Sequence, residues 1–355
     1  MPPLQCQRLV LPLALAALMA ACRQPTEKLF VTSTDAPSRT GLVALEDGVL
    51  AGNEAGRLLR LDGQGEVRWR VELGREVAAR PTVSGDSVVV GTVGGALVSL
   101  TLAEGTERWR LTGQPAVLTP LVSDASAVYV VAPDGTVRAH AVDSGEVRWR
   151  RPFPSGEPRP DATRPLPSPV LAGDLVVVAL GDAGLFALSA EEGTVRWRRP
   201  LAQVLGMVAH EDVLYVSTRK GQVLALGLVD GRERWRRTHA TALTSPPTLA
   251  RGQLWVGTED NLLLGLALQD GKEGSRLTLP APLVTQVAEY QEWLLVPTRG
   301  SQGWLLALKP GQGPPVFSLR LDTPLTTRPV VLGDQLFVLG QDGRVLSWRL
   351  KPPKP

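Results

Sequence analysis

The sequence predicts an all-β protein, an eight-bladed β-propeller made of four-stranded antiparallel blades. Three observations support this prediction. A Gly-x-x-x-Trp pair returns at intervals of 38 to 48 residues, a β-prone hydrophobic run of about six residues occurs eight times, and helical periodicity is absent after residue 25. Repeats of about 40 to 45 residues with four strands each are typical of propeller blades. An open β-solenoid or a stack of separate sandwiches is the alternative.

The hydrophobic runs are interpreted as the central strands of the blades. Short β-branched runs bounded by Gly or Asp turns indicate strands rather than helices. A second run follows each of them after a Gly turn, and a short apolar segment precedes it, as at Arg80–Val83 and Arg328–Val331. The eight runs are Gly48–Asn53, Ser87–Thr92, Ala127–Ala132, Leu175–Leu180, Val213–Thr218, Gln253–Thr258, Trp293–Thr298 and Gln335–Gly340.

The Gly-x-x-x-Trp segment supplies the fourth, outer strand of each predicted blade. Degenerate copies occur at Gly271/Ser275 and Gly313/Phe317. We expect the tryptophans to be buried structural residues where one blade packs on the next, because radial repetition buries both faces of each sheet. They are Trp69, Trp109, Trp149, Trp197 and Trp235.

Ring closure follows from a count of strands. The first three strand types occur eight times, but the Gly-x-x-x-Trp type occurs seven times. The β-prone segment Lys28–Thr34 precedes the first repeat and is predicted to complete the last blade, which removes an open sheet edge. The propeller is therefore predicted to span residues 28–350, followed by a polar, proline-rich tail at 351–355.

The N-terminus is predicted to be a signal peptide at residues 1–21. Arg8 is followed by the apolar stretch Leu9–Ala21, which is too short to span a bilayer. The apolar-Ala-Ala-Cys ending resembles a bacterial lipobox, which implies that Cys22 becomes the lipidated N-terminus and that residues 22–27 form a tether. Ordinary cleavage, with Cys22 a free thiol, is the alternative.

Composition excludes several classes of function. The 355 residues carry a formal net charge of +3, which falls to +2 when Arg8 is removed with the signal peptide, so nothing indicates nucleic-acid binding. Cys6 and Cys22 are the only cysteines, and Cys6 lies in the segment to be removed. The mature chain is therefore expected to be a disulfide-free monomer although its compartment is oxidising.

Arginines flank each repeat tryptophan, as in Arg68-Trp69-Arg70. On a strand they share the face opposite to the tryptophan, so they are expected to ring the circumference. Such a belt could bind anionic partners. Alternatively, the charges protect the outer edges against sheet-to-sheet aggregation.

The longest departure from the period is an insertion after Trp149. The segment Arg151–Ser168 is rich in proline and arginine. A stiff exposed loop on a rigid scaffold is a candidate docking element, and we expect Arg159, Arg164 and Leu166 to contact a partner. A neutral insertion at a tolerant turn is the alternative.

The chain lacks a recognisable catalytic group. His140, His210 and His239 lie in different repeats, without the spacing of a metal site. No P-loop, nucleophile elbow or dinucleotide fingerprint is present. We therefore predict no catalytic residue, no metal and no cofactor.

The repeat resembles the Ala-x-Asp-x-x-x-Gly-x-x-x-Trp motif of the PQQ-like, quinoprotein-type β-propeller family, over about residues 28–350. Ala187, Gly193 and Trp197 match its spacing. One departure is that the Asp position holds Leu61, Thr101, Ala141, Ser189, Gly227, Ala267 and Lys309, so the Asp contacts of that motif are expected to be absent.

The resemblance implies two kinds of function. Quinoprotein dehydrogenases use an Asp base, Ca²⁺ ligands and often adjacent cysteines around pyrroloquinoline quinone, and this chain shows no such set. The BamB family of outer-membrane-assembly lipoproteins comprises non-catalytic scaffolds that bind the barrel-assembling protein through a Leu/Arg loop and an acidic pair. Leu166 and Arg164 lie in a comparable loop, but Pro200–Gly206, where the acidic pair would lie, has no acid.

By this resemblance the chain is expected to be a lipid-anchored scaffold of the bacterial cell envelope, on the outer membrane and facing the periplasm. Its expected partner is an envelope protein such as the β-barrel assembly machinery. A propeller lipoprotein that binds another protein, a glycan or a small ligand is the second hypothesis, and a quinoprotein enzyme is the third.

Overall fold

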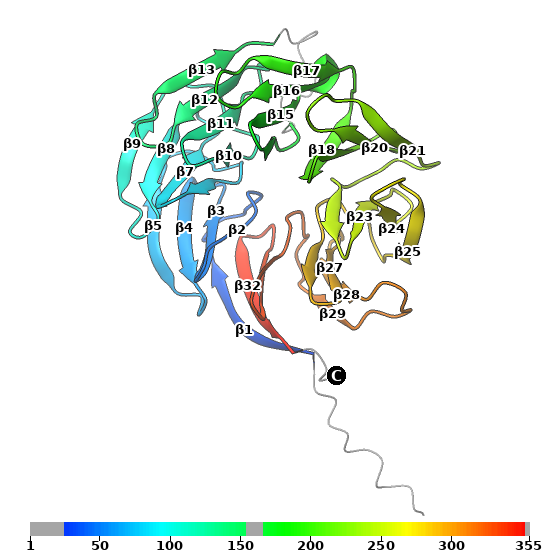
Figure 1. Cartoon of the computed structure of the whole chain (residues 1–355). Helices are drawn as coiled ribbons and strands as arrows, with labels where there is room; N and C mark the ends of the chain where they lie inside the picture. The colour runs from blue at the N-terminus through cyan, green and yellow to red at the C-terminus, as the bar shows by residue number, and fades with distance from the viewer. Residues whose placement is uncertain (1–24, 154–165, 352–355) are drawn as a thin grey trace, which may run out of the picture.

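The computed structural model describes residues 25–153 and 166–351, which form eight four-stranded antiparallel sheets arranged in a ring (Figure 1). Within these residues the helical structure is a single 3₁₀ turn at Gly181–Ala183. No helix of this part of the chain is long and apolar enough to cross a membrane. The predicted all-β, eight-bladed propeller is confirmed.

Each of the first seven blades uses four consecutive strands, ordered from the channel outward. Blade 1 contains β2 (Val43–Ala44), β3 (Gly48–Gly52), β4 (Arg57–Asp62) and β5 (Val67–Glu72). Blade 2 contains β6 (Thr82–Ser84), β7 (Ser87–Gly91), β8 (Leu97–Thr101) and β9 (Glu107–Leu111). Blade 3 contains β10 (Val122–Ser123), β11 (Ala127–Val131), β12 (Val137–Ala141) and β13 (Val147–Arg151). Blade 4 contains β14 (Val170–Ala172), β15 (Leu175–Ala179), β16 (Leu185–Ser189) and β17 (Val195–Arg199).

The second half repeats the pattern. Blade 5 contains β18 (Val204–His210), β19 (Val213–Thr218), β20 (Gln222–Gly227) and β21 (Glu233–Thr238). Blade 6 contains β22 (Thr248–Ala250), β23 (Gln253–Gly257), β24 (Leu262–Ala267) and β25 (Glu273–Thr278). Blade 7 contains β26 (Ala288–Tyr290), β27 (Trp293–Pro297), β28 (Trp304–Leu308) and β29 (Phe317–Arg320). Blade 8 contains β30 (Val330–Leu332), β31 (Gln335–Leu339), β32 (Arg344–Leu350) and β1 (Thr26–Ser33).

The hydrophobic core lies between neighbouring blades. Every residue of β3, β7, β11, β15 and β27 is buried. Each of these strands packs one face on the preceding blade and the other face on the following blade, so the strand is buried along its whole length and its apolar residues do not alternate with exposed polar ones. The cluster between blades 1 and 2, for example, joins Leu50 and Leu58 to Val88 and Val98.

The ring closes by pairing the two ends of the chain. β1 runs antiparallel to β32, with Thr26 opposite Leu350 and Ser33 opposite Arg344. The backbone N–H of Lys351 extends the seam by donating to Pro25 O at 2.7 Å. The prediction of closure by the N-terminal strand is confirmed. The strand begins at Thr26 instead of Lys28, so residues 26 and 27 belong to blade 8 and not to the tether.

The repeat tryptophans tie each blade to the next one. A Cβ atom at Gly105 would lie 2.8 Å from the ring of Trp69, so the indole of blade 1 rests directly on a glycine of blade 2. The same Trp69 donates Nε1–H to Leu102 O at 2.9 Å. Trp109, Trp149, Trp197 and Trp235 repeat both contacts with Gly145, Gly193, Gly231 and Gly271 and with Val142 O, Ala190 O, Leu228 O and Leu268 O.

The ring of tryptophan contacts, here called the girdle, is interrupted near the closure of the ring, where other residues replace the tryptophan. Phe30 of β1 takes the place of a tryptophan and covers Gly65 of blade 1. Blade 6 has Ser275 in place of the tryptophan, and the hydroxyl of Ser275 donates a hydrogen bond to Gln253 Oε1 at 3.0 Å. In blade 7, Phe317 packs edge-on against Trp293 with ring centroids 5.6 Å apart. Trp69 and Trp197 are buried, whereas the other three girdle tryptophans are partly exposed.

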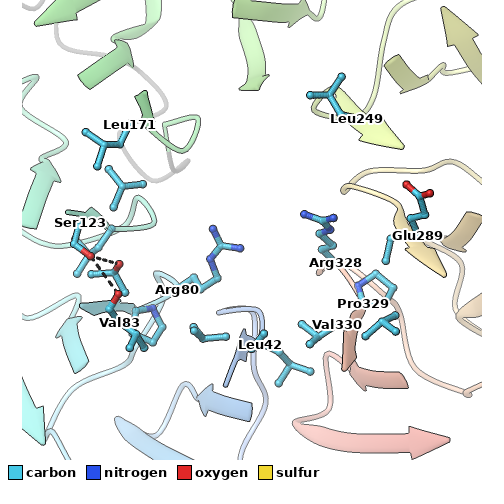
Figure 2. A pocket seen from close by; sticks show the side chains of 18 residues that line it. Leu42, Arg80, Val83, Ser123, Leu171, Leu249, Glu289, Arg328, Pro329 and Val330 are labelled. Carbon is cyan, nitrogen blue, oxygen red and sulfur yellow. Dashed lines mark hydrogen bonds between the residues drawn. The ribbon is translucent and has the colours of Figure 1, made fainter. Parts of the chain in front are cut away.

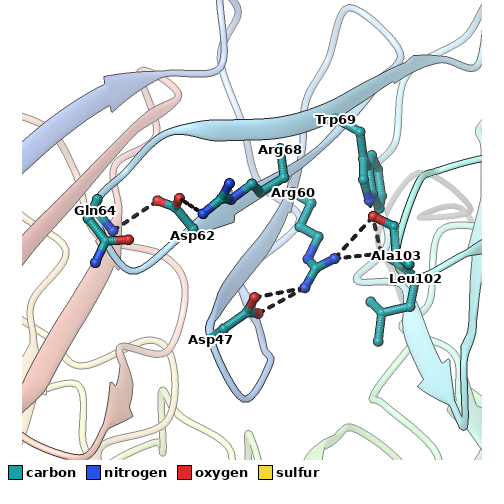
Figure 3. Close-up of polar contacts among 8 residues, drawn as sticks. All are labelled: Asp47, Arg60, Asp62, Gln64, Arg68, Trp69, Leu102 and Ala103. Atoms are coloured by element: carbon teal, nitrogen blue, oxygen red, sulfur yellow. Dashed lines mark hydrogen bonds and ion pairs between the residues drawn. The ribbon is translucent and has the colours of Figure 1, made fainter.

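The expected loss of every Asp contact is wrong for blade 1. The turn between β4 and β5 is one residue shorter than its counterparts, so Asp62, and not Leu61, stands opposite Gly48, as Thr101 stands opposite Ser87. Asp62 is 3% exposed, and its Oδ1 accepts the N–H groups of Gln64 and Glu66, both at 2.9 Å. Figure 3 shows the contact with Gln64. A strict residue count from the tryptophan missed this carboxylate.

Candidate functional site

The central channel contains a cavity of about 790 Å³ (Figure 2). The innermost strands and the residues just before them form its wall. These residues follow the loops that connect one blade to the next, and seven of the eight blades, all except blade 5, contribute lining residues from this part of the repeat. Polar and apolar atoms both line the wall, and its aliphatic residues include Leu42, Leu121, Leu171, Leu249 and Val330.

Two arginines lie among these aliphatic residues. Arg80 and Arg328 occupy the same repeat position, each two residues before the innermost-strand residue that starts the pairing, in blades 2 and 8. Figure 2 shows both guanidinium groups pointing from the wall into the channel. The carbonyl of Arg80 accepts the N–H of Leu121 at 3.2 Å, which ties its backbone to blade 3.

The surroundings of the two arginines disfavour their charge. Arg80 is partly buried and Arg328 is exposed. Desolvation by the surrounding chain lowers the pKa of Arg80, and desolvation together with the nearby charge of Arg80 lowers the pKa of Arg328. Both remain protonated at neutral pH because an arginine guanidinium does not lose its proton in proteins. Among the residues that the structure describes, neither has a carboxylate within 4 Å. The channel carboxylate, Glu289, is paired instead with Arg251, whose Nη1 lies 3.6 Å from Oε1.

The predicted docking segment begins and ends in the same hydrophobic cluster. Phe153 follows β13 and stacks on Phe186 with ring centroids 4.5 Å apart. Leu166 precedes β14 and is buried with these two rings and with Leu180. Arg159 and Arg164 lie outside the described residues. Both ends of the insertion are therefore pinned at the junction of blades 3 and 4.

Burial changes the interpretation of Leu166. Its side chain is 6% exposed and fills the space between two blades. A side chain in that position contributes to blade packing and offers no surface to a partner. We therefore drop Leu166 from the predicted contact residues and treat it, with Phe153, as a support of the segment.

Arginines of the outer strands in blades 1, 2 and 5 are paired with neighbouring carboxylates. Arg68 lies 2.8 Å from Asp62, and Arg70 lies 3.0 Å from Asp35. Arg108 and Arg234 pair with aspartates at the turn after the innermost strand of their own blades. Paired charges on an outer edge favour edge protection over a belt for anionic partners.

No group of three or more His, Cys, Asp or Glu residues that could hold a metal occurs in residues 25–153 and 166–351. The expectation that the three histidines lie in different repeats is wrong: His140 lies in blade 3, but His210 ends β18 and His239 follows β21, both in blade 5. His140 is buried on β12, where its Nδ1 lies 2.9 Å from Gly145 O. Burial lowers the pKa of His140 and of His239. Cys22 lies outside the described residues.

Sequence reasoning missed the channel arginines, although a signal was present. Arg80-Pro81 and Arg328-Pro329 open two of the short apolar segments that precede the central strands. These segments became the innermost strands, so a charged residue at their start faces the channel. The arginines near the tryptophans are more numerous, but they lie on the outer circumference of the ring and not at the channel.

A family model and a curated relative point to the same protein family. A family model described as "Outer membrane protein assembly factor BamB" matches residues 54–204 and 203–274, which together exceed half of the chain. A protein of that name from Shewanella oneidensis is 24% identical over 312 residues, which cover 86% of this chain and 69% of that protein.

Solved structures show the same fold in proteins of different function. BamB from Moraxella catarrhalis has a TM-score of 0.75 at 18% identity and covers 91% of this chain and 99% of its own. The quinohemoprotein alcohol dehydrogenase from Comamonas testosteroni also reaches 0.75, at 11% identity, covering 94% of this chain and 77% of its own. At such identities the likeness establishes the propeller and leaves the activity open.

Proposed function

The chain belongs to the family of the outer membrane protein assembly factor BamB, and from this premise we propose that it is a non-catalytic scaffold that docks protein partners during assembly of outer-membrane β-barrel proteins. The observation that carries the proposal is the family match, which runs across blades 1 to 6. The relationship to the Shewanella oneidensis protein extends over 86% of the chain and supports the same role for the whole ring.

The proposed location is the bacterial outer membrane, with the ring in the periplasm. In this scheme residues 1–21 are a signal peptide and Cys22 carries the lipid. The tether is short, because β1 already begins at Thr26. The protein would reach the membrane through acyl chains, as a monomeric propeller.

We propose that the partner binds at the insertion between Phe153 and Leu166. Both flanking residues are buried in one cluster between blades 3 and 4, so the segment is held by a rigid base. Binding residues often lie on loops that a rigid scaffold positions. Arg159 and Arg164 supply positive charge that suits an acidic surface on the partner.

The experiment that tests this proposal is capture of envelope proteins by crosslinking in intact cells, followed by mass spectrometry. We expect the parent to capture a component of the barrel assembly machinery, and Arg159→Glu with Arg164→Glu to weaken capture without changing the melting temperature. The control is Arg232→Glu with Arg320→Glu, which makes the same charge change at two surface ion pairs.

Two outcomes would contradict the proposal at different levels. Capture that survives the reversal at 159 and 164 would move docking away from the insertion but keep the scaffold. Alcohol oxidation by the protein after addition of pyrroloquinoline quinone and Ca²⁺ would contradict the non-catalytic role itself. A scaffold tolerates such additions without gaining turnover, whereas an enzyme depends on single groups by orders of magnitude.

A further inference from the structure

We propose that the central channel is a binding site for a small oxyanion carrying two or more negative charges, and that Arg80 and Arg328 hold it. This inference is independent of the docking role proposed above. It starts from the position of the two guanidinium groups, which face the same cavity from blades 2 and 8 (Figure 2).

The wall between the two arginines leaves room for a ligand. Blade 1 separates blades 2 and 8, and at the equivalent repeat position it has Gly41. A Cβ atom at Gly41 would lie 3.8 Å from Cδ of Arg80 and 3.8 Å from Cβ of Thr327. Because Gly41 has no side chain, blade 1 places no side-chain atoms at this position beside Arg80 and Thr327.

The charges in this place are not balanced by the protein. Several arginines of the outer strands lie next to Asp or Glu, as at Arg68 and Arg276. Around the channel, in the part of the chain that the structure describes, neither Arg80 nor Arg328 has such a partner, and the carboxylate of Glu289 is held by Arg251. Two like charges that face one cavity repel, so an anion bound between them gains attraction from both and relieves their repulsion.

The chemistry of the donors indicates the ligand class. A guanidinium presents a planar fork of N–H donors that matches the two oxygens of a carboxylate or phosphate. A cavity of about 790 Å³ lies in the range of small-molecule sites, which combine apolar walls with a few convergent polar groups. A ligand with two or more oxyanion charges engages both arginines, whereas a monovalent ion engages them weakly.

The test is calorimetric titration of the purified full-length chain with citrate and, separately, with pyrophosphate, at ionic strength matched with sodium chloride. We expect saturable binding of one equivalent, and the stronger of the two probes distinguishes a carboxylate ligand from a phosphate ligand. The variant Arg80→Gln with Arg328→Gln should weaken binding by about tenfold or more, since loss of a charge-assisted contact is of that order. Thermal unfolding checks that the variant is folded.

The matched control is Arg39→Gln with Arg276→Gln, which removes the same charge from two surface ion pairs and should leave binding unchanged. The single variants Arg80→Gln and Arg328→Gln provide the same comparison if the double variant does not fold. The proposal is overturned if the parent binds neither probe saturably at millimolar concentration. It is equally overturned if the channel variants bind like the parent, or if the control loses binding to the same extent.

Discussion

At the residue scale, the repeat glycine satisfies two demands at once. Gly231 has a φ of +66°, and a Cβ atom there would lie 2.7 Å from Cδ2 of Trp197. The backbone angle alone disfavours other residues, because L side chains strain in the left-handed region. The indole adds a second restriction, because it occupies the space where a side chain would go. The Gly-x-x-x-Trp spacing therefore reflects contacts between neighbouring blades, because a glycine such as Gly231 leaves room for the tryptophan ring of the preceding blade.

These two restrictions can be separated by a matched pair of variants. Gly252 has a φ of +68°, but a Cβ atom there meets nothing within 4 Å. We expect Gly252→Ala to cost about 1–2 kcal/mol of unfolding free energy from backbone strain. Gly231→Ala should cost about 1–3 kcal/mol more, because the methyl group also displaces the indole. Urea unfolding followed by tryptophan fluorescence measures both, and equal losses would show that the indole contact is not restrictive.

A second residue-scale consequence concerns pH. His140 is 1% exposed, and burial lowers its pKa below the ordinary value of about 6.5. Its hydrogen bond to Gly145 O has the opposite, smaller effect, and the charge of Arg138 lowers the pKa further. Between the lowered folded pKa and the unfolded pKa, the unfolded chain binds more protons, so stability rises with pH in this window. Stability is therefore lost as pH falls below about 6.5.

We expect His140→Gln to flatten this dependence, which urea unfolding at several values between pH 5 and pH 8 measures. His210→Gln is the control, because His210 is exposed, and it should keep the slope of the parent. Part of the slope should remain in His140→Gln, since burial also lowers the pKa of His239. An unchanged slope in His140→Gln would exclude His140 as a source of the acid sensitivity.

At the element scale, β1 is the strand that contacts both ends of the chain, because it pairs with β32 and packs on blade 1. It pairs with β32 along seven register positions and supplies Phe30, which covers Gly65 of blade 1 and lies edge-on to Phe337 at 6.0 Å. A single strand therefore completes one sheet and joins it to the next blade. Without it, β32 would present an unpaired edge, and the girdle would open between blades 8 and 1.

The contribution of β1 can be tested inside the strand. Phe30→Ala should lower the unfolding free energy by about 3 kcal/mol, the lower end for loss of a packed aromatic ring, because Phe30 is only partly buried. Val31→Ala is the control, since Val31 is 41% exposed and, as the next residue along the strand, lies on the face of β1 opposite to Phe30. Deletion of residues 26–33 should lower the melting temperature more than either substitution does. A deletion variant that melts with the parent would show that the ring does not depend on this strand.

At the scale of the whole molecule, the ring could be predicted because its constraints are periodic. Eight hydrophobic runs against seven Gly-x-x-x-Trp strands were enough to predict the closure by β1. The channel site was missed because Arg80 and Arg328 are 248 residues apart and meet only when blades 2 and 8 flank blade 1. Leu166 was misjudged because a proline-rich context indicates exposure, whereas its burial depends on Phe153 and Phe186 from neighbouring strands. Local patterns predict elements, but contacts across the ring need the assembled fold.

The closure also determines where the ring would sit relative to a membrane. Four residue steps separate Cys22 from the start of β1 at Thr26, a reach of at most about 14 Å. A lipid on Cys22 would therefore hold the edge of blade 8 near the bilayer. Blade 4 is opposite to blade 8 in a ring of eight, as Figure 1 shows, so the junction that carries the insertion would lie on the far side of the ring.

This arrangement depends on lipidation at Cys22, and cell fractionation tests it. We expect Cys22→Ser to lose stable outer-membrane association, appearing in the soluble periplasmic fraction or as an uncleaved precursor in the inner membrane. Buried acyl chains contribute ~0.8 kcal/mol per CH₂, and stable anchoring needs more than one chain. Cys6→Ser is the matched control: it changes the other cysteine, in the segment expected to be removed, and should fractionate like the parent. Outer-membrane association retained by Cys22→Ser would mean that the ring is held there by its partner or its surface, and the short-tether geometry would no longer apply.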